Sequence, residues 1–135
     1  MAKTHSQHNY EACEFILNHG NFHDWVVTTA FYSALHHVQE EIFPFTDRDG
    51  NSYNTFEQYF SKALRDGKQV SKHKLTIKLV EQRIPGAGNL YRSLHDMCRT
   101  CRYRNYMVTE KKAKVAKSYL DKIIKLKAES EDQND

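Results

Sequence analysis

The stretch LHDMCRTCRYRNY at residues 94–106 combines side chains that bind metals, phosphates and bases. Cys98 and Cys101 form a C-x-x-C pair, which is found in zinc sites and in thiol redox centres. The arginines and tyrosines around the pair suit other ligands, because guanidinium groups bind phosphate in a bidentate manner and aromatic rings stack on unpaired bases. The stretch is therefore a metal site, a redox pair, a nucleic-acid surface or one face of an ordinary helix.

Helical geometry separates the two kinds of side chain in this stretch. At about 100° per residue, one stripe of the helix is apolar and is predicted to be buried. That stripe holds Leu90, Tyr91, Leu94, Met97, Cys98 and Cys101. The flank and the opposite face hold Arg92, His95, Arg99, Arg102 and Tyr103, and Arg104 lies on the other flank. We therefore expect the cysteines in the core and the arginines in contact with solvent or a partner.

The cysteine pair fits a metal or redox role poorly. A zinc site would need two more ligands, for which Cys13, His95 and the doublet 36–37 are the candidates. A redox C-x-x-C pair opens a helix beside a strand, whereas this pair lies in the middle of a predicted helix. Buried free cysteines are common packing residues. We predict that the pair is part of the core and that the protein uses no metal and no cofactor.

The net charge is distributed unevenly along the chain. The whole chain carries +3, but four acidic residues lie in the last seven positions, ESEDQND. Removing those four negative charges leaves +7 on residues 1–128. A basic body is compatible with a polyanionic partner, and lysine-rich surfaces also serve solubility. The charge alone leaves both interpretations open.

The rest of the sequence predicts an all-α protein. Its 135 residues contain only two prolines and five glycines, so long helices are allowed. We predict an up-and-down bundle of about five helices with a long, buried second helix. Expected helix starts are Thr4 or Ser6, Asn21, Ser71, Asn89 and Thr109. A short helix is also expected over FEQYFSKAL, and residues 44–55 are expected to form a loop.

Domain organisation and location follow from length and hydropathy. We expect one domain over residues 1–128 and a disordered acidic tail over residues 129–135. No apolar run reaches the roughly 18–20 residues that a membrane span requires, and the first residues lack the apolar region of a secretory signal. We therefore expect a cytoplasmic protein without a membrane partner.

The order of features resembles the HEPN (higher eukaryotes and prokaryotes nucleotide-binding) family of small helical bundles. The features are FHDWVVTTAFYSALHHV on a long second helix, an SKH helix start, YRSLHDMCRTCRYRNY, and a final helix rich in lysine and alanine. The most distinctive part runs from Asp24 to His36. The resemblance covers the chain except its tail. It implies a bundle of four or five helices, usually dimeric and often found in toxin-antitoxin and defence systems of bacteria or archaea.

Many HEPN proteins are metal-independent RNases whose motif is an arginine followed after four to six residues by a histidine. Arg104-Asn105 looks like the start of this motif, but Thr109, Glu110 and Lys111 occupy the histidine positions. No arginine in the chain has a histidine at the required offset. This departure argues against the family's usual cleavage site.

Three function hypotheses remain. The first is a non-catalytic or degenerate HEPN-like module that binds RNA, a nucleotide or a protein partner through Arg92, Arg99, Arg102, Tyr103, Arg104 and Asn105. The second is a metal-independent endoribonuclease with an atypical site, for which the candidates are Arg99, Arg104, His73 and His95. The third is a structural or assembly subunit without a nucleic-acid role. We expect a homodimer, and RNA or a nucleotide and a cognate protein are the other candidate partners.

Overall fold

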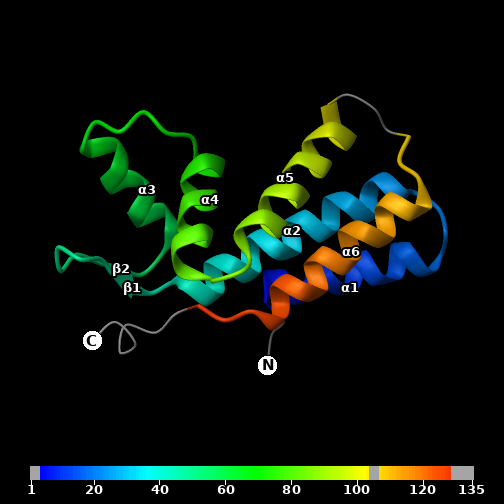
Figure 1. Cartoon of the computed structure of the whole chain (residues 1–135), viewed down its shortest axis with the longest axis horizontal. Coiled ribbons are helices and arrows are strands. Elements are labelled where there is room, and N and C mark those ends of the chain that lie inside the picture. The colour runs from blue at the N-terminus through cyan, green and yellow to red at the C-terminus, as the bar shows by residue number, and fades with distance from the viewer. Residues whose placement is uncertain (1–3, 104–106, 129–135) are drawn as a thin grey trace.

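The computed structural model describes residues 4–103 and 107–128, without the side chain of Tyr103. The predicted tail at residues 129–135 lies outside the described residues. The described part contains six α-helices and one two-stranded sheet (Figure 1). In chain order they are α1 (His5–Asn18), α2 (His23–Ile42), β1 (Phe45–Thr46), β2 (Ser52–Tyr53), α3 (Phe56–Arg65), α4 (Lys72–Arg83), α5 (Gly88–Tyr103) and α6 (Glu110–Lys125). The predicted all-α fold class is confirmed.

Four of the helices form a bundle around α2. Helix α2 packs against α1, α5 and α6, and α5 also packs against α6. The pairs α1–α2 and α5–α6 run antiparallel (Figure 1). Val26, Ala30, Ala34 and Val38 of α2 are fully buried, as the prediction of a long buried second helix requires. Small side chains at two of these positions allow neighbouring helices to approach closely.

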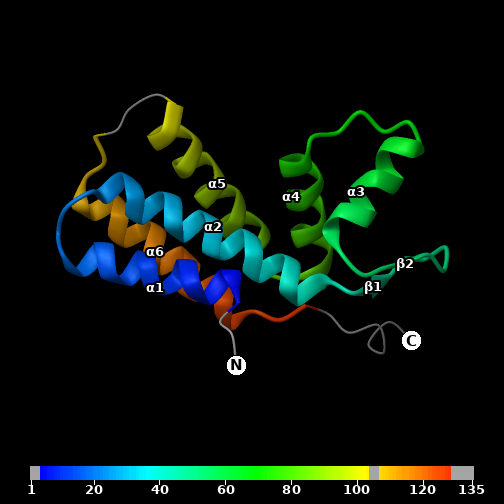
Figure 2. The same ribbon diagram turned by 180° about the vertical axis from the view of Figure 1, so that it is seen from behind.

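Helices α3 and α4 lie with the small sheet at one end of the molecule, beside the bundle (Figure 2). Helix α4 packs against α5, and α3 contacts β2. The centre of this lobe is a cluster of aromatic rings whose centroids lie 5.1–6.3 Å apart. Its members are Phe43, Phe45, Tyr53, Phe56 and Tyr59. The bundle and the lobe therefore meet along α4 and α5.

Three predicted helix starts are confirmed by their capping geometry. Thr4 caps α1 in a capping box, in which its side chain accepts from the Gln7 amide and the Gln7 side chain accepts from the Thr4 amide. Ser71 and Thr109 cap α4 and α6 without a capping box: their hydroxyl groups accept from the amides of Lys74 and Lys112. Each cap satisfies a backbone N–H that the first helical turn leaves unpaired.

The predicted start of α2 at Asn21 is wrong by one residue. Phe22 occupies the N-cap position with φ 60°, in the left-handed region, and makes no side-chain cap. Its carbonyl accepts from the amides of Trp25 and Val26, so the backbone alone begins the helix. Gly20, with φ 73°, turns the chain after α1. The sequence pattern does not predict this left-handed conformation of Phe22.

The predicted loop at residues 44–55 contains the two-stranded sheet. Phe45 pairs with Tyr53 and Thr46 pairs with Ser52 in antiparallel register. The turn is closed by Asp47, whose carboxylate accepts from the Asp49 and Asn51 amides. Strands of two residues are too short to produce the alternation by which strands are recognised in a sequence.

The hydroxyl group of Tyr91 gives a stability prediction. Tyr91 is fully buried, and its hydroxyl has no hydrogen-bond partner among the described residues. Replacement of Tyr91 by phenylalanine is therefore expected to leave the free energy of unfolding unchanged or to raise it by about 1 kcal/mol, because a desolvated hydroxyl is removed. Urea denaturation measures this change.

Tyr10 provides the matched control for Tyr91→Phe. Its hydroxyl donates to Asp121 Oδ1 at 2.8 Å and accepts from Lys117 Nζ at 2.9 Å. Tyr10→Phe is expected to lower the free energy of unfolding by about 1–2 kcal/mol, because both partners lose a charge-assisted bond. A larger loss of unfolding free energy for Tyr91→Phe than for Tyr10→Phe would contradict the conclusion that the Tyr91 hydroxyl has no hydrogen-bond partner.

Candidate nucleic-acid interface

Helix α5 has the orientation that its sequence predicts. Tyr91, Leu94, Cys98 and Cys101 are buried, and Leu90 and Met97 pack half-buried against the core. Arg92, Arg99 and Arg102 are exposed. The buried stripe contacts α2 and α6, so the arginines are held on a rigid element and point away from the core. Three predicted binding residues therefore lie on one accessible helix.

The cysteines lie in surroundings that favour the thiol. Burial raises the pKa of Cys98 and Cys101, and it raises the pKa of Cys13 to about 11. All three are free and buried. Within residues 4–103 and 107–128, no three side chains of His, Cys, Asp or Glu are arranged to hold a metal ion. The burial supports the interpretation of the cysteines as packing residues.

The three arginines differ in their contacts. Arg92 pairs with Glu81 at 2.7 Å, and both side chains are about half exposed, so water weakens this ion pair. The guanidinium of Arg102 lies 5.5 Å from the centroid of the Trp25 ring. Arg99 has no ion pair with any residue of the described part of the chain. Of these three arginines, Arg99 is therefore the one most available to a phosphate.

Two of the predicted catalytic candidates come together although they belong to different helices. The rings of His73 on α4 and His95 on α5 have centroids 4.7 Å apart. Phe31 of α2 lies below both, at 6.1 Å from His73 and 5.6 Å from His95. Burial, together with the neighbouring His95, lowers the pKa of His73. His73 is therefore a neutral imidazole at pH 7 and can accept a proton.

His95 connects this pair to the arginine surface. Its side chain is 16% exposed, and its Nδ1 lies 3.6 Å from a carboxylate oxygen of Asp96. Arg99 follows His95 by four residues, so the two side chains emerge one turn apart on the same side of α5. We use the name "α4–α5 surface" for His73, His95, Arg99 and Arg102.

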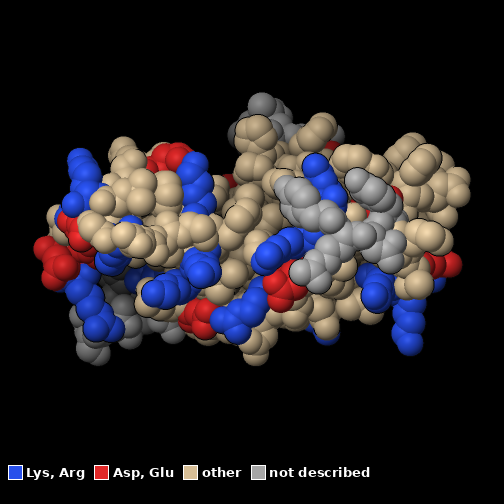
Figure 3. Space-filling model, turned by 90° about the horizontal axis from the view of Figure 1, so that it is seen from above, with Lys and Arg blue, Asp and Glu red and all other residues tan. Residues whose placement is uncertain are grey.

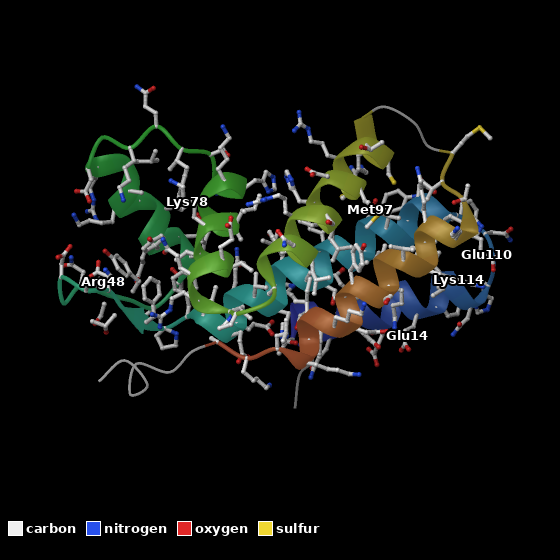
Figure 4. The ribbon with its side chains drawn as sticks, in the orientation of Figure 1. Glu14, Arg48, Lys78, Met97, Glu110 and Lys114 are labelled. Atoms are coloured by element: carbon white, nitrogen blue, oxygen red, sulfur yellow. The ribbon has the colours of Figure 1, made fainter. Side chains whose placement is uncertain are left out.

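Lysine and arginine side chains lie on both sides of the α4–α5 surface. Seen from above, they lie over both the α3–α4 lobe and the bundle, with Asp and Glu side chains among them (Figure 3). Lys78 lies on α4, whereas Arg48 lies at the far tip of the hairpin (Figure 4). Charges of both signs therefore occur on this face, and the positive charge that a polyanion would meet on α5 comes from Arg92, Arg99 and Arg102.

A groove on another part of the bundle is lined in part by acidic side chains. It has a volume of about 850 Å³ and lies between α1, α2 and α6. Its lining includes the acidic residues Glu11, Glu40 and Asp121, together with His37 and Lys125. Burial lowers the pKa of His37, so this side chain adds no positive charge at pH 7. Because carboxylates repel phosphates, this groove does not suit a nucleic acid.

Some predicted binding residues are not placed. Arg104, Asn105 and the side chain of Tyr103 lie outside the described residues. The described part also contains two exposed aromatic residues on α2, the helix that was predicted to be buried. Trp25 is 47% exposed and Tyr32 is 40% exposed. Their spacing of seven residues places them on the same side of the helix, but it does not indicate that this side is exposed.

Comparison of the chain with protein-family models, with curated proteins and with solved structures finds no match. Within residues 4–103 and 107–128, no helix is long and apolar enough to cross a membrane.

Proposed function

We propose that this protein is a HEPN-like helical module that binds RNA through the α4–α5 surface. The observation that carries the proposal is the position of Arg99, which is exposed, unpaired among the described residues and one turn from a histidine pair. Guanidinium groups bind phosphate oxygens strongly, and imidazole adds hydrogen-bond donors beside them. The arginines stand on a helix packed into the core, so little ordering is needed upon binding.

The proposed oligomeric state, location and biological system come from the resemblance to the HEPN family. We propose a homodimer in the cytoplasm, with a cognate protein partner in a bacterial or archaeal toxin-antitoxin or defence system. Binding of a protein alone, through the same exposed arginines, is the outcome that would replace the RNA role.

A binding experiment on metal-free protein tests the proposal. Anisotropy of a labelled single-stranded RNA is measured at several salt concentrations, for the wild type and for an Arg99→Ala, Arg102→Ala double variant. The variant is expected to bind about 10–100-fold more weakly, because two cations leave the surface. The slope of log affinity against log salt should fall by about 0.7 for each lost phosphate contact.

The matched control removes two positive charges from another place. Lys125 and Lys127 are exposed near the end of α6, so Lys125→Ala, Lys127→Ala changes the net charge equally. This control is expected to retain most of the affinity and of the salt slope. Equal losses in both double variants would mean that the net charge alone attracts RNA, and the α4–α5 surface would be rejected as the site.

A second candidate function is RNA cleavage without a metal, and the contact between His73 and His95 favours it. A phosphate does not fit between rings whose centroids are 4.7 Å apart, so the pair cannot hold acid and base on opposite sides of a phosphorus atom. One imidazole can still act alone as the base. His73, neutral at pH 7 and exposed, is the better base, and Arg99 would stabilise the charge on the phosphate.

A further inference from the structure

Trp25 and Tyr32 form an exposed pair on α2 beside the α4–α5 surface. They are seven residues apart, which is about 20° short of two helical turns and about 10 Å along the helix axis. Large aromatic side chains are normally among the more buried residues, so two of them at 47% and 40% exposure on one stripe are unusual. Both lie on a helix that otherwise forms the centre of the bundle.

The contacts of these two rings connect them to the proposed RNA site. Arg102 of α5 lies over the Trp25 ring. Tyr32 contacts Phe31 at 5.4 Å between centroids, and the Phe31 ring in turn contacts His73 and His95. One ring therefore stands at the arginine end of the α4–α5 surface and the other at the histidine end.

The surface between the two rings presents little that would compete with a ligand. Thr29 lies one turn after Trp25, and its hydroxyl donates to the Trp25 carbonyl at 2.7 Å. This hydroxyl is therefore occupied by the backbone. A threonine is also short, so it covers little of the neighbouring rings, whereas Arg102 lies over the Trp25 ring.

Unpaired bases are the ligand that this combination suits. Every base has a flat π face that stacks on an aromatic side chain, and each stack contributes about 1–3 kcal/mol. In a duplex, the bases are stacked on one another and their faces are not available. Arginines that bind the backbone next to rings that bind bases are the arrangement used for single strands.

We infer that Trp25 and Tyr32 are base-stacking platforms, and that the protein prefers single-stranded RNA with unpaired bases over duplex RNA. This inference rests on the proposed RNA-binding function and deepens it by naming the form of the RNA. Phosphates lie along Arg99 and Arg102, and two bases turn toward α2.

The chain's single tryptophan allows a direct test, because Trp25 is the only source of indole fluorescence. Titration of the wild type with a single-stranded oligoadenylate is expected to quench this fluorescence, since a base stacks on the indole ring. A duplex of equal length should bind at least about 10-fold more weakly and cause little quenching.

Substitutions distinguish a loss of base stacking from a loss of folding. Trp25→Leu and Tyr32→Leu are each expected to weaken single-strand binding by about 5–150-fold, the range of one lost stack. Trp25→Phe and Tyr32→Phe keep a ring and should retain most of the affinity. Phe15→Leu is the control, because Phe15 is an exposed aromatic residue on α1, outside this surface.

The outcomes distinguish this inference from the proposed function. If RNA affinity depends on Arg99 and Arg102, but the leucine variants bind like the wild type or duplex binds equally well, the stacking inference is wrong and RNA binding stands. If the wild type binds neither form of RNA, both are wrong.

Discussion

Leu94→Ala is expected to lower the free energy of unfolding by about 2–5 kcal/mol. Leu94 is fully buried in the stripe of α5 that packs against α2 and α6. Its removal takes apolar surface out of the core and leaves a cavity that rigid neighbouring helices fill only in part. Urea denaturation followed by circular dichroism measures the loss, with an unchanged dependence on urea concentration if the variant folds normally.

The control for Leu94→Ala lies on the same helix. Arg99→Ala removes an exposed side chain without a partner among the described residues and should change the free energy of unfolding by no more than about 0.5 kcal/mol. Nearly equal effects of the two substitutions would mean that the buried face of α5 is assigned wrongly. The control also shows whether a loss of RNA affinity in Arg99→Ala could be caused by unfolding of the variant.

The orientation of α5 could be predicted because it depends on local information. The 100° repeat places Tyr91, Leu94, Cys98 and Cys101 on one stripe, and burial of that stripe is what the structure contains. The starts of α1, α4 and α6 were predictable for the same reason, whereas the predicted starts at Asn21 and Asn89 were wrong, because Phe22 caps α2 and α5 begins at Gly88. A threonine or serine at the N-cap bonds to an amide three residues away, so the whole signal lies within one turn.

The exposed face of α2 could not be predicted in this way. Residues 25–35 are apolar or small on every side, which indicates a helix surrounded by others. In the structure, α2 packs mainly against α1, α5 and α6, and Trp25 and Tyr32 lie in the remaining sector. Which sector stays uncovered depends on how many helices pack around α2, and that is a property of the whole fold.

The contact between His73 and His95 could not be predicted from the sequence for a related reason. The RNase motif consists of an arginine and a histidine at a fixed distance along the chain, so it describes residues on one element. His73 and His95 are brought together by the packing of α4 on α5. The sequence identified both as candidates but contained no information about their contact.

Removal of the His73 imidazole is expected to have the largest effect on RNA cleavage. In the second candidate function, His73 accepts the proton of the 2′-hydroxyl, whose oxygen then forms a bond to phosphorus. The bond from phosphorus to the 5′-oxygen breaks, and that oxygen takes a proton from water, which leaves a cyclic phosphate and a 5′-hydroxyl. The resulting hydroxide takes the proton back from His73. His73→Ala should therefore cleave about 10²–10⁴-fold more slowly, with RNA affinity changed little.

The pH dependence of cleavage tests the same role independently. The pKa of His73 is lowered from 6.5 by burial and by His95. The unprotonated base is the active form, so the rate should be constant at pH values well above the lowered pKa and fall as the pH decreases through it. In His95→Ala one of the two causes is removed, so the pKa of His73 should rise and the fall in rate should begin at a higher pH.

The control for His73 is His8→Ala, because His8 is exposed on α1 and belongs to no part of the α4–α5 surface. Cleavage products are measured on metal-free protein in the presence of a chelator, so that a contaminating metal-dependent nuclease is silent. An equal rate in His73→Ala and in the wild type would remove His73 as the base. A wild type that binds RNA but cleaves none would reject the second candidate, and the contact between His73 and His95 would then serve binding, by joining α4 to the arginine face of α5.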